Sequence, residues 1–195
     1  MIVLKFGGTS VSGSTQIQQV IKILKQQDKP IAVVVSALGG VTDDLHALGM
    51  EAANGITSYT DGLKAVEGRH IDLVKELIPV AKQSAVLSAT KQMMNNLETI
   101  LDGAYMIREL SPKTLDTLLS FGELLSHTII AHAANANGLD AIAKNAQELI
   151  VTTQSQGQTL VDYGTTNANI TAFFKENSHD VVIIPGFVSK NNAGV

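Results

Sequence analysis

The 195-residue sequence contains no cysteine, which excludes disulfides, thiolate metal sites and cysteine nucleophiles and fits a reducing compartment. Long apolar runs are missing as well. The first run, residues 1–4, stops at Lys5 and is too short for the core of a signal peptide. Nowhere do about 18 apolar residues follow one another, which is the length that a membrane-spanning helix needs. We therefore expect a cytoplasmic protein without a membrane partner.

Clusters of basic residues are also absent. The chain has 14 Lys and Arg residues against 18 Asp and Glu residues, and its formal net charge is −4. A surface that binds nucleic acid needs several cations facing phosphates, so we expect no nucleic-acid partner. Hydrophobic residues make up 45% of the chain and charged residues 16%, which excludes a disordered segment. A small-molecule function is favoured.

The first third of the sequence alternates between strand and helix patterns. Residues 2–6 form a short apolar run that ends at two glycines, and residues 14–27 carry apolar side chains at helical spacing after a Ser14 or Thr15 N-cap. Residues 31–37 then form an uninterrupted apolar run, which is typical of a strand buried on both faces of a parallel sheet. This order predicts a βαβ unit and an α/β fold.

The rest of the chain divides into a helical part and a second strand-rich part. The pattern predicts a strand-rich segment over 1–41, helices over 42–137 and another strand-rich segment over 138–195. Strands are expected at 139–143, 148–152 and 180–187, with a helix at 166–176 between the last two. The final residues, "GFVSKNNAGV", look like a loop without a closing helix or strand. We therefore expect this chain to be part of a longer domain.

Two glycine-containing stretches follow predicted strands. "LKFGGTSV", residues 4–11, matches neither the Walker A loop nor the dinucleotide fingerprint, so a tight turn and a phosphate-binding loop are about equally good interpretations. "VVVSALGGVTD", residues 33–43, runs from a strand into Ser36, a glycine pair and Thr42, which could N-cap the next helix. If the two strands are neighbours, both glycine stretches lie side by side at the ligand-binding edge of the sheet.

Two later stretches carry further candidate residues. Glu123 lies in the apolar helical run "LLSFGELLSH", where a buried carboxylate needs a partner such as a ligand ammonium, an arginine or a backbone amide. Glu123 and His127 have a spacing compatible with zinc, but the sequence supplies no clear third ligand, so we predict no metal site. In "IIPGFVS", Phe187 follows a buried strand and is expected at the same edge of the sheet.

With "KFGGTSV", "VVSALGGVTD", "SFGELLS" and "IIPGFVS" in this order, the sequence resembles the aspartokinases of the amino acid kinase superfamily over essentially its whole length. The resemblance implies a three-layer α/β/α sandwich, truncated here and carrying a helical insertion. It also implies a kinase that uses ATP and Mg²⁺ to phosphorylate the β-carboxylate of L-aspartate. That reaction is the first step towards lysine, threonine and methionine.

The resemblance assigns roles to particular residues. Lys5 corresponds to the catalytic, phosphate-binding lysine, and Phe6, Gly7 and Gly8 to the ATP-binding stretch. Ser36 corresponds to a serine at the phosphoryl region that contacts both ATP and substrate. Thr42 and Glu123 correspond to aspartate-binding residues, and Phe187 to a phenylalanine near the substrate.

The same resemblance sets further expectations and leaves alternatives. A glycine-rich segment with an arginine and a serine for the substrate is expected after Val195, so the isolated chain is predicted to be inactive, whereas the intact enzyme is expected to be a homo-oligomer. Many relatives have Asp-Ala-Arg where this chain has Asn145, Ala146 and Gln147. The alternatives are another amino acid kinase, such as a glutamate or uridylate kinase, and a folded fragment without catalytic activity.

Overall fold

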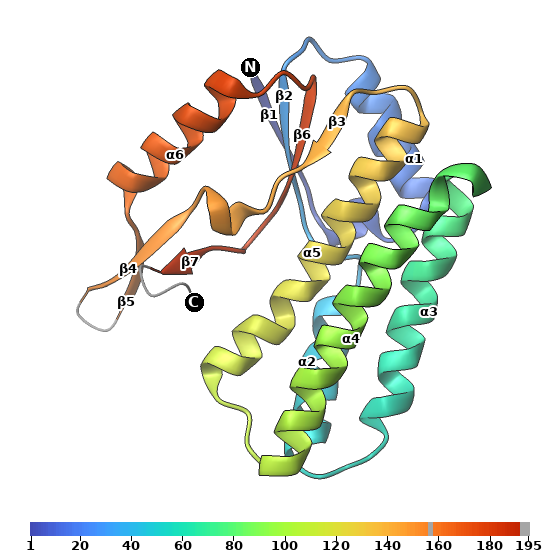
Figure 1. Ribbon diagram of the computed structural model, residues 1–195, viewed down its shortest axis with the longest axis vertical. Coiled ribbons are helices and arrows are strands. Elements are labelled where there is room, and N and C mark those ends of the chain that lie inside the picture. The colour runs from blue at the N-terminus through green and yellow to red at the C-terminus, as the bar shows by residue number, and fades with distance from the viewer. Residues whose placement is uncertain (156–157, 192–195) are drawn as a thin grey trace.

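The computed structural model describes residues 1–155 and 158–191 (Figure 1). The first part of the chain and the helices that follow it are β1 (Ile2–Phe6), η1 (Gly8–Val11), α1 (Ser14–Lys25), β2 (Ile31–Val35), α2 (Val41–Ala53), α3 (Tyr59–Leu77), η2 (Val80–Lys82), α4 (Gln83–Ile107) and α5 (Pro112–Ala136). The remaining elements are β3 (Ala141–Ala143), η3 (Ala146–Glu148), β4 (Val151–Ser155), β5 (Gln158–Val161), α6 (Tyr163–Glu176), β6 (Val181–Pro185) and β7 (Lys190–Asn191).

The main sheet is parallel and has the strand order β1-β2-β6-β3. Phe6 pairs with Val35, and Val35 pairs with Pro185, so these three strands end at the same level. Strands β2 and β6 are buried along most of their length, as their continuous apolar runs predict. Strand β1 lies at one edge of the described sheet, and its side chains alternate between exposed and half-buried. The predicted neighbouring strand ends are confirmed.

Helices cover both sides of this sheet. Helix α5 packs against β2, β3 and β6, and Figure 1 shows α1 and α5 on one side of the sheet and α6 on the other. The helices α2 to α5 pack against one another and extend beyond the sheet as a bundle. One apolar core runs through the sheet and the bundle, with Ile31, Leu45, Leu97 and Ile129 all fully buried. The predicted α/β fold with a parallel sheet and a helical insertion is confirmed.

A small second sheet joins β5, β4 and β7 in that order. Strand β4 pairs antiparallel with β5 and parallel with β7. The expectation of a loop without a closing strand is therefore wrong at Lys190–Asn191, because these residues pair with β4, while residues 192–195 lie outside the described part of the chain. The strand expected at 148–152 begins only at Val151, because the Asn145 side chain accepts the Gln147 N–H and caps the short helix η3.

Candidate active site

A cleft of about 890 Å³ lies at the carboxyl edge of the main sheet. Chain segments that follow β1, β2, β3 and β6 all contribute to it, together with the first half of α5. This edge is where open parallel sheets bind ligands. One side, here called the helix side, consists of Gly8, residues 36–40, Thr42, Asp43, Lys113, Asp116, Thr117, Leu119, Ser120 and Glu123. The opposite strand side consists of Gln147, Thr152, Thr159, Phe187, Val188, Ser189 and Asn191.

Two glycine loops meet on the helix side: the first loop comprises residues 7–13 and the second residues 36–40. A Cβ on Gly8 would lie 3.2 Å from the Ala37 carbonyl oxygen, and a Cβ on Gly39 would lie 3.1 Å from the Ser12 Cβ. Larger residues would push the loops apart. Gly40 has φ +85°, a left-handed conformation that favours glycine, and the helix α2 starts directly after it.

The expected hydroxyl N-caps are wrong for both helices that follow these loops. Gly13 is the N-cap of α1 and Gly40 is the N-cap of α2, in place of Ser14 or Thr15 and Thr42. Hydroxyl residues favour N-caps in general, but here glycines occupy the positions where the two loops turn into their helices. Thr42 lies instead in the first turn of α2, exposed, where it lines the cleft.

Helix α5 approaches the end of β2 closely because Gly122 has no side chain. A Cβ on Gly122 would lie 2.8 Å from the Cβ of Ala37. One residue later, Glu123 is only 7% exposed, and burial raises the pKa of its carboxyl while the Ala37 backbone N–H partly opposes this shift. The buried Ser126 hydroxyl donates to the Ser36 carbonyl at 2.7 Å, so α5 is also tied to the second glycine loop. The predicted burial of Glu123 is confirmed.

Phe187 lies on the strand side, just after β6. Its side chain is 96% exposed and its φ is +56°, a left-handed conformation that is strained for a residue with a side chain. Such strain costs about 1–3 kcal/mol and is typically retained at functional sites.

Three of the predicted residues do not line the cleft. Lys5 is exposed near the carboxyl end of β1, Phe6 packs against the apolar core, and Gly7 accepts a hydrogen bond from the Ser10 N–H at 2.9 Å. The cleft thus brings together Gly8, Ser36, Thr42, Glu123 and Phe187 of the predicted set. The roles assigned to all eight residues stay predictions.

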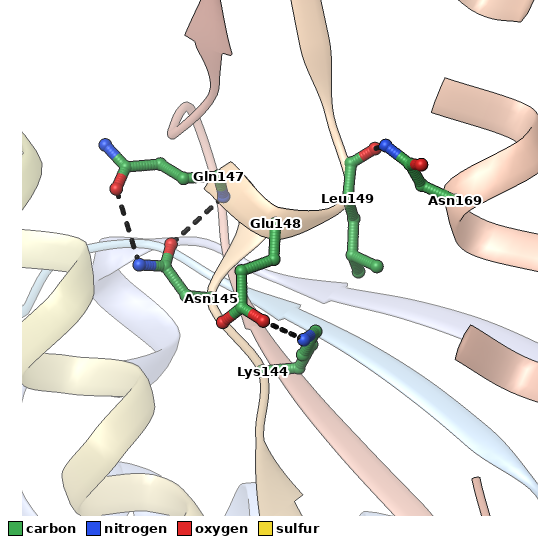
Figure 2. A network of polar contacts seen from close by, with 6 residues as sticks. All are labelled: Lys144, Asn145, Gln147, Glu148, Leu149 and Asn169. Carbon is green, nitrogen blue, oxygen red and sulfur yellow. Dashed lines mark hydrogen bonds and ion pairs between the residues drawn. The ribbon is translucent and has the colours of Figure 1, made fainter. Parts of the chain in front are cut away.

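Gln147, in the segment between β3 and β4, lines the cleft. Figure 2 shows the polar contacts of this segment. The Asn145 Oδ1 accepts the Gln147 backbone N–H at 3.0 Å, and the Asn145 Nδ2 donates to the Gln147 Oε1 at 3.4 Å. Beside them, Lys144 forms an ion pair with Glu148, and the Asn169 side chain on α6 donates to the Leu149 carbonyl at 3.3 Å. Two neutral amides therefore satisfy one another where many relatives are expected to carry opposite charges.

Several lining residues were missed by the motif analysis. Lys113, Asp116, Thr117 and Ser120 lie on α5 ahead of Glu123 and line the cleft with it. Counted from Lys113, the other three residues follow after three, four and seven positions, which places all four on one face of a helix. Stepping back from Glu123 by three or four positions at a time therefore identifies them. Gln147 and Ser189 have no comparable signal in the sequence.

The cleft carries more negative than positive charge. Asp43, Asp116 and Glu123 line it together with a single described cation, Lys113. Over residues 1–155 and 158–191, no three His, Cys, Asp or Glu side chains come together as a metal site. His127 lies beside the Leu124 carbonyl, with its Nδ1 at 2.7 Å from that oxygen, and burial lowers its pKa. None of the described helices combines the length and apolarity needed to cross a membrane.

Comparison with known proteins identifies the family of this chain. The sequence model of the amino acid kinase family matches residues 1–195. The chain therefore belongs to the amino acid kinase family. Within it, the chain is 32% identical over 196 residues to aspartokinase 1 of Arabidopsis thaliana, a chloroplastic protein, with 96% of this chain and 33% of that protein covered. It is 29% identical over 187 residues to the chloroplastic bifunctional aspartokinase/homoserine dehydrogenase 1 of the same plant, with 95% of this chain and 20% of that protein covered.

The fold is also that of a solved aspartokinase. Escherichia coli aspartokinase III in complex with lysine and aspartate superposes with a TM-score of 0.86 at 23% identity, covering all of this chain and 42% of that one. The complex of the same enzyme with aspartate and ADP superposes with a TM-score of 0.84 at 23% identity over the same shares. The chain thus spans between a fifth and a third of the length of the sequence relatives given above.

Proposed function

We propose that this chain is the amino-terminal part of an aspartokinase catalytic domain and that the full-length protein transfers a phosphoryl group from ATP to L-aspartate. A carboxylate oxygen of aspartate attacks the γ-phosphorus, the bond from that phosphorus to the bridging oxygen of ADP breaks, and 4-phospho-L-aspartate and ADP form. Support comes from the similarity to aspartokinases and from a cleft at the carboxyl edge of the sheet that unites four predicted site segments.

The observation that carries the substrate assignment is the buried carboxyl of Glu123. Burial raises its pKa and the Ala37 backbone N–H opposes this shift, so a positive partner inside the cleft would further stabilise the ionised form. The α-ammonium of an amino acid is such a partner, and its binding would favour the ionised carboxylate. Ser36 and Thr42 line the same cleft, and their hydroxyls would donate to the substrate carboxylates.

The nucleotide assignment depends on the two glycine loops. Backbone N–H groups at Gly8 and Gly40 can approach phosphate oxygens closely because neither residue has a side chain, and Lys5 would add a cation at the end of β1. Asp43 and Asp116 line the cleft and would supply oxygen ligands for Mg²⁺, which commonly binds through one or two carboxylates and the phosphates of the nucleotide. Mg²⁺ would neutralise charge on the transferred phosphoryl group.

Phosphoryl transfer needs positioning and charge neutralisation more than covalent chemistry from the protein. The isolated 195-residue chain is proposed to be inactive, since it covers only part of the length of its relatives. A cytoplasmic location and a homo-oligomeric full-length enzyme complete the proposal. Another amino acid kinase and a folded non-catalytic fragment are the rival functions.

The test measures ADP release by the full-length protein and ligand binding by titration calorimetry. We expect ADP release that depends on L-aspartate and Mg²⁺, and an L-aspartate affinity that falls at least about tenfold in Glu123→Gln, because the substrate ammonium loses its charged partner. The exposed Glu76→Gln variant is the matched control. ADP release supported by glutamate or uridylate and not by aspartate would favour another kinase. An absence of both turnover and binding would leave a folded protein without catalytic activity.

A further inference from the structure

Arg69 on α3 contacts both glycine loops, although it belongs to the helical bundle and not to the cleft lining. Its Nη2 donates to the Ser12 carbonyl at 3.1 Å and to the Gly39 carbonyl at 2.8 Å. These partners precede Arg69 in the sequence by 57 and 30 positions. One nitrogen therefore bridges the end of the first loop and the turn of the second.

The rest of the guanidinium supports this bridging role. Arg69 is half-buried, and it forms none of the ion pairs found in the described part of the chain. Its charge is thus directed at two neutral carbonyl oxygens, and hydrogen bonds from a charged donor are shorter and stronger than those between neutral groups. The fixed planar fork of arginine makes such a contact geometrically specific.

The two contacts also orient the peptide groups on which the loops depend. Both peptide bonds involved are trans, so the N–H of Gly40 points away from the Gly39 carbonyl that faces Arg69, and the N–H of Gly13 points away from the Ser12 carbonyl. Gly40 lines the cleft, and Gly13 and Gly40 are the N-caps of α1 and α2. The Gly39 carbonyl that accepts from Arg69 therefore points away from the N–H of the cleft-lining Gly40.

The two loops pack closely because of their glycines. A Cβ added to Gly8 would lie 3.2 Å from the Ala37 carbonyl oxygen, and a Cβ added to Gly39 would lie 3.1 Å from the Ser12 Cβ. Gly40 has a left-handed backbone, which glycine adopts more readily than other residues, and its own backbone therefore does little to fix the second loop. Among the side-chain hydrogen bonds of the described residues, those of Arg69 are the ones that bridge these two loops.

We infer that Arg69 is a positioning residue for phosphoryl transfer: it holds the two glycine loops in one relative placement, so that nucleotide phosphates and the substrate carboxylate meet in line. This inference rests on the proposed kinase function for its catalytic consequence, whereas the bridging of the loops does not depend on it. A displacement of about 1 Å between reacting groups lowers rates by about a hundredfold. Loss of the two carbonyl contacts should therefore lower kcat more than it lowers ligand affinity.

The experiment compares Arg69→Ala, Arg69→Gln and Arg69→Lys in the full-length protein, with Lys64→Ala as the control that removes a cation from an exposed position of the same helix. Hydrogen–deuterium exchange of residues 7–13 and 36–40 is measured without ligand, and kcat and KM for ATP and L-aspartate are measured per folded molecule. Millimolar guanidinium is added to Arg69→Ala as a chemical rescue.

We expect faster exchange in both loops of Arg69→Ala, a 10- to 100-fold lower kcat with KM values within about threefold, partial recovery in Arg69→Lys and recovery of kcat with guanidinium. Lys64→Ala should match the unaltered protein. Unchanged exchange in either loop, or a kcat that falls only in proportion to the folded fraction, would overturn the inference. If the unaltered protein does not phosphorylate aspartate while both loops loosen in Arg69→Ala, the proposed function fails and the bridging role stands.

Discussion

The two sides of the cleft differ in how their residues are held in place. The helix side rests on the apolar core: Gly122 packs against Ala37, Glu123 is buried, and Ser126 and Arg69 bind the backbone of the second loop. The strand side combines residues of the small three-stranded sheet with the segments around Gln147 and directly after β6, and its aromatic residue, Phe187, is almost fully exposed. Substitutions on the helix side should therefore change both the free energy of unfolding and ligand binding. Substitutions on the strand side should change one of these without the other.

The largest effect is expected for Gly122→Ala. Its new Cβ would lie 2.8 Å from the Cβ of Ala37, so α5 must move away from the end of β2. Overpacking of this kind lowers the free energy of unfolding by about 2 kcal/mol, and the shift of Glu123 should weaken L-aspartate binding as well. Urea unfolding and calorimetry measure the two effects.

The control for this change is Gly103→Ala on α4, where a Cβ would meet no atom within 4 Å. That substitution should raise the free energy of unfolding by up to about 1 kcal/mol, because alanine favours a helix more than glycine does. Equal stability changes in the two variants would contradict the close packing of the helix side.

The second prediction concerns low pH, which should lower the free energy of unfolding through His70 in the helical bundle. His70 is fully buried, its Nδ1 lies 2.7 Å from the Val66 carbonyl, and its Nε2 has no partner in the described structure. Burial, aided by the charge of Arg69, lowers its pKa from 6.5. The folded state therefore binds a proton less readily than the unfolded chain.

It follows that the stability contributed by neutral His70 is fully present above about pH 6.5 and is lost as the pH falls towards the lowered pKa. The loss approaches about 1.4 kcal/mol per pH unit, because one more proton is bound on unfolding. Urea unfolding measures the free energy of unfolding at pH 7.5 and pH 5.5. The difference between the two values should be smaller in His70→Asn than in the unaltered protein, and the amide of the variant can still donate to the Val66 carbonyl. The same slope in both proteins would refute this role.

Much of this architecture is predictable from local pattern. Strands β2 and β6 are continuous apolar runs between turns, and the long helices repeat apolar residues with helical periodicity. The four residues of β5 are all exposed and the two residues of β7 are half-buried, so neither strand shows a burial pattern that sequence reasoning can use. Short strands of this kind form because a partner strand is available, which is a property of the tertiary fold.

The candidate site likewise contains features that the sequence predicts and features that it does not. Gly8, Ser36 and Phe187 follow strands, and parallel strands end at one edge of a sheet, so their proximity could be predicted. The contacts of Arg69 could not, because they depend on how the bundle packs on the two loops. The N-caps were mispredicted for a related reason: hydroxyl preference is local, whereas the positions at which α1 and α2 begin depend on how the glycine loops pack.

The third prediction concerns the strand side and uses the strained backbone of Phe187. Phe187→Gly should raise the free energy of unfolding by about 1 kcal/mol relative to Phe187→Ala, because both lose the exposed ring but only glycine adopts φ +56° without strain. Urea unfolding of the two variants isolates the backbone contribution. If Phe187→Ala is as stable as Phe187→Gly, the left-handed conformation at this position is not strained.

The smallest effect is expected at Asn145, which holds the cleft-lining Gln147 on the strand side. Asn145→Ala removes the acceptor of the Gln147 backbone N–H and the contact to the Gln147 Oε1, while the Lys144–Glu148 ion pair and the Asn169 contact to Leu149 remain. Because η3 is only three residues long, the free energy of unfolding should fall by only about 0.5 kcal/mol. The side-chain amide resonances of Gln147 should shift in NMR spectra, whereas Asn95→Ala, at an exposed position of α4, should leave them unchanged. Unaltered Gln147 resonances in Asn145→Ala would show that Gln147 is placed by the strand side as a whole and not by this amide pair.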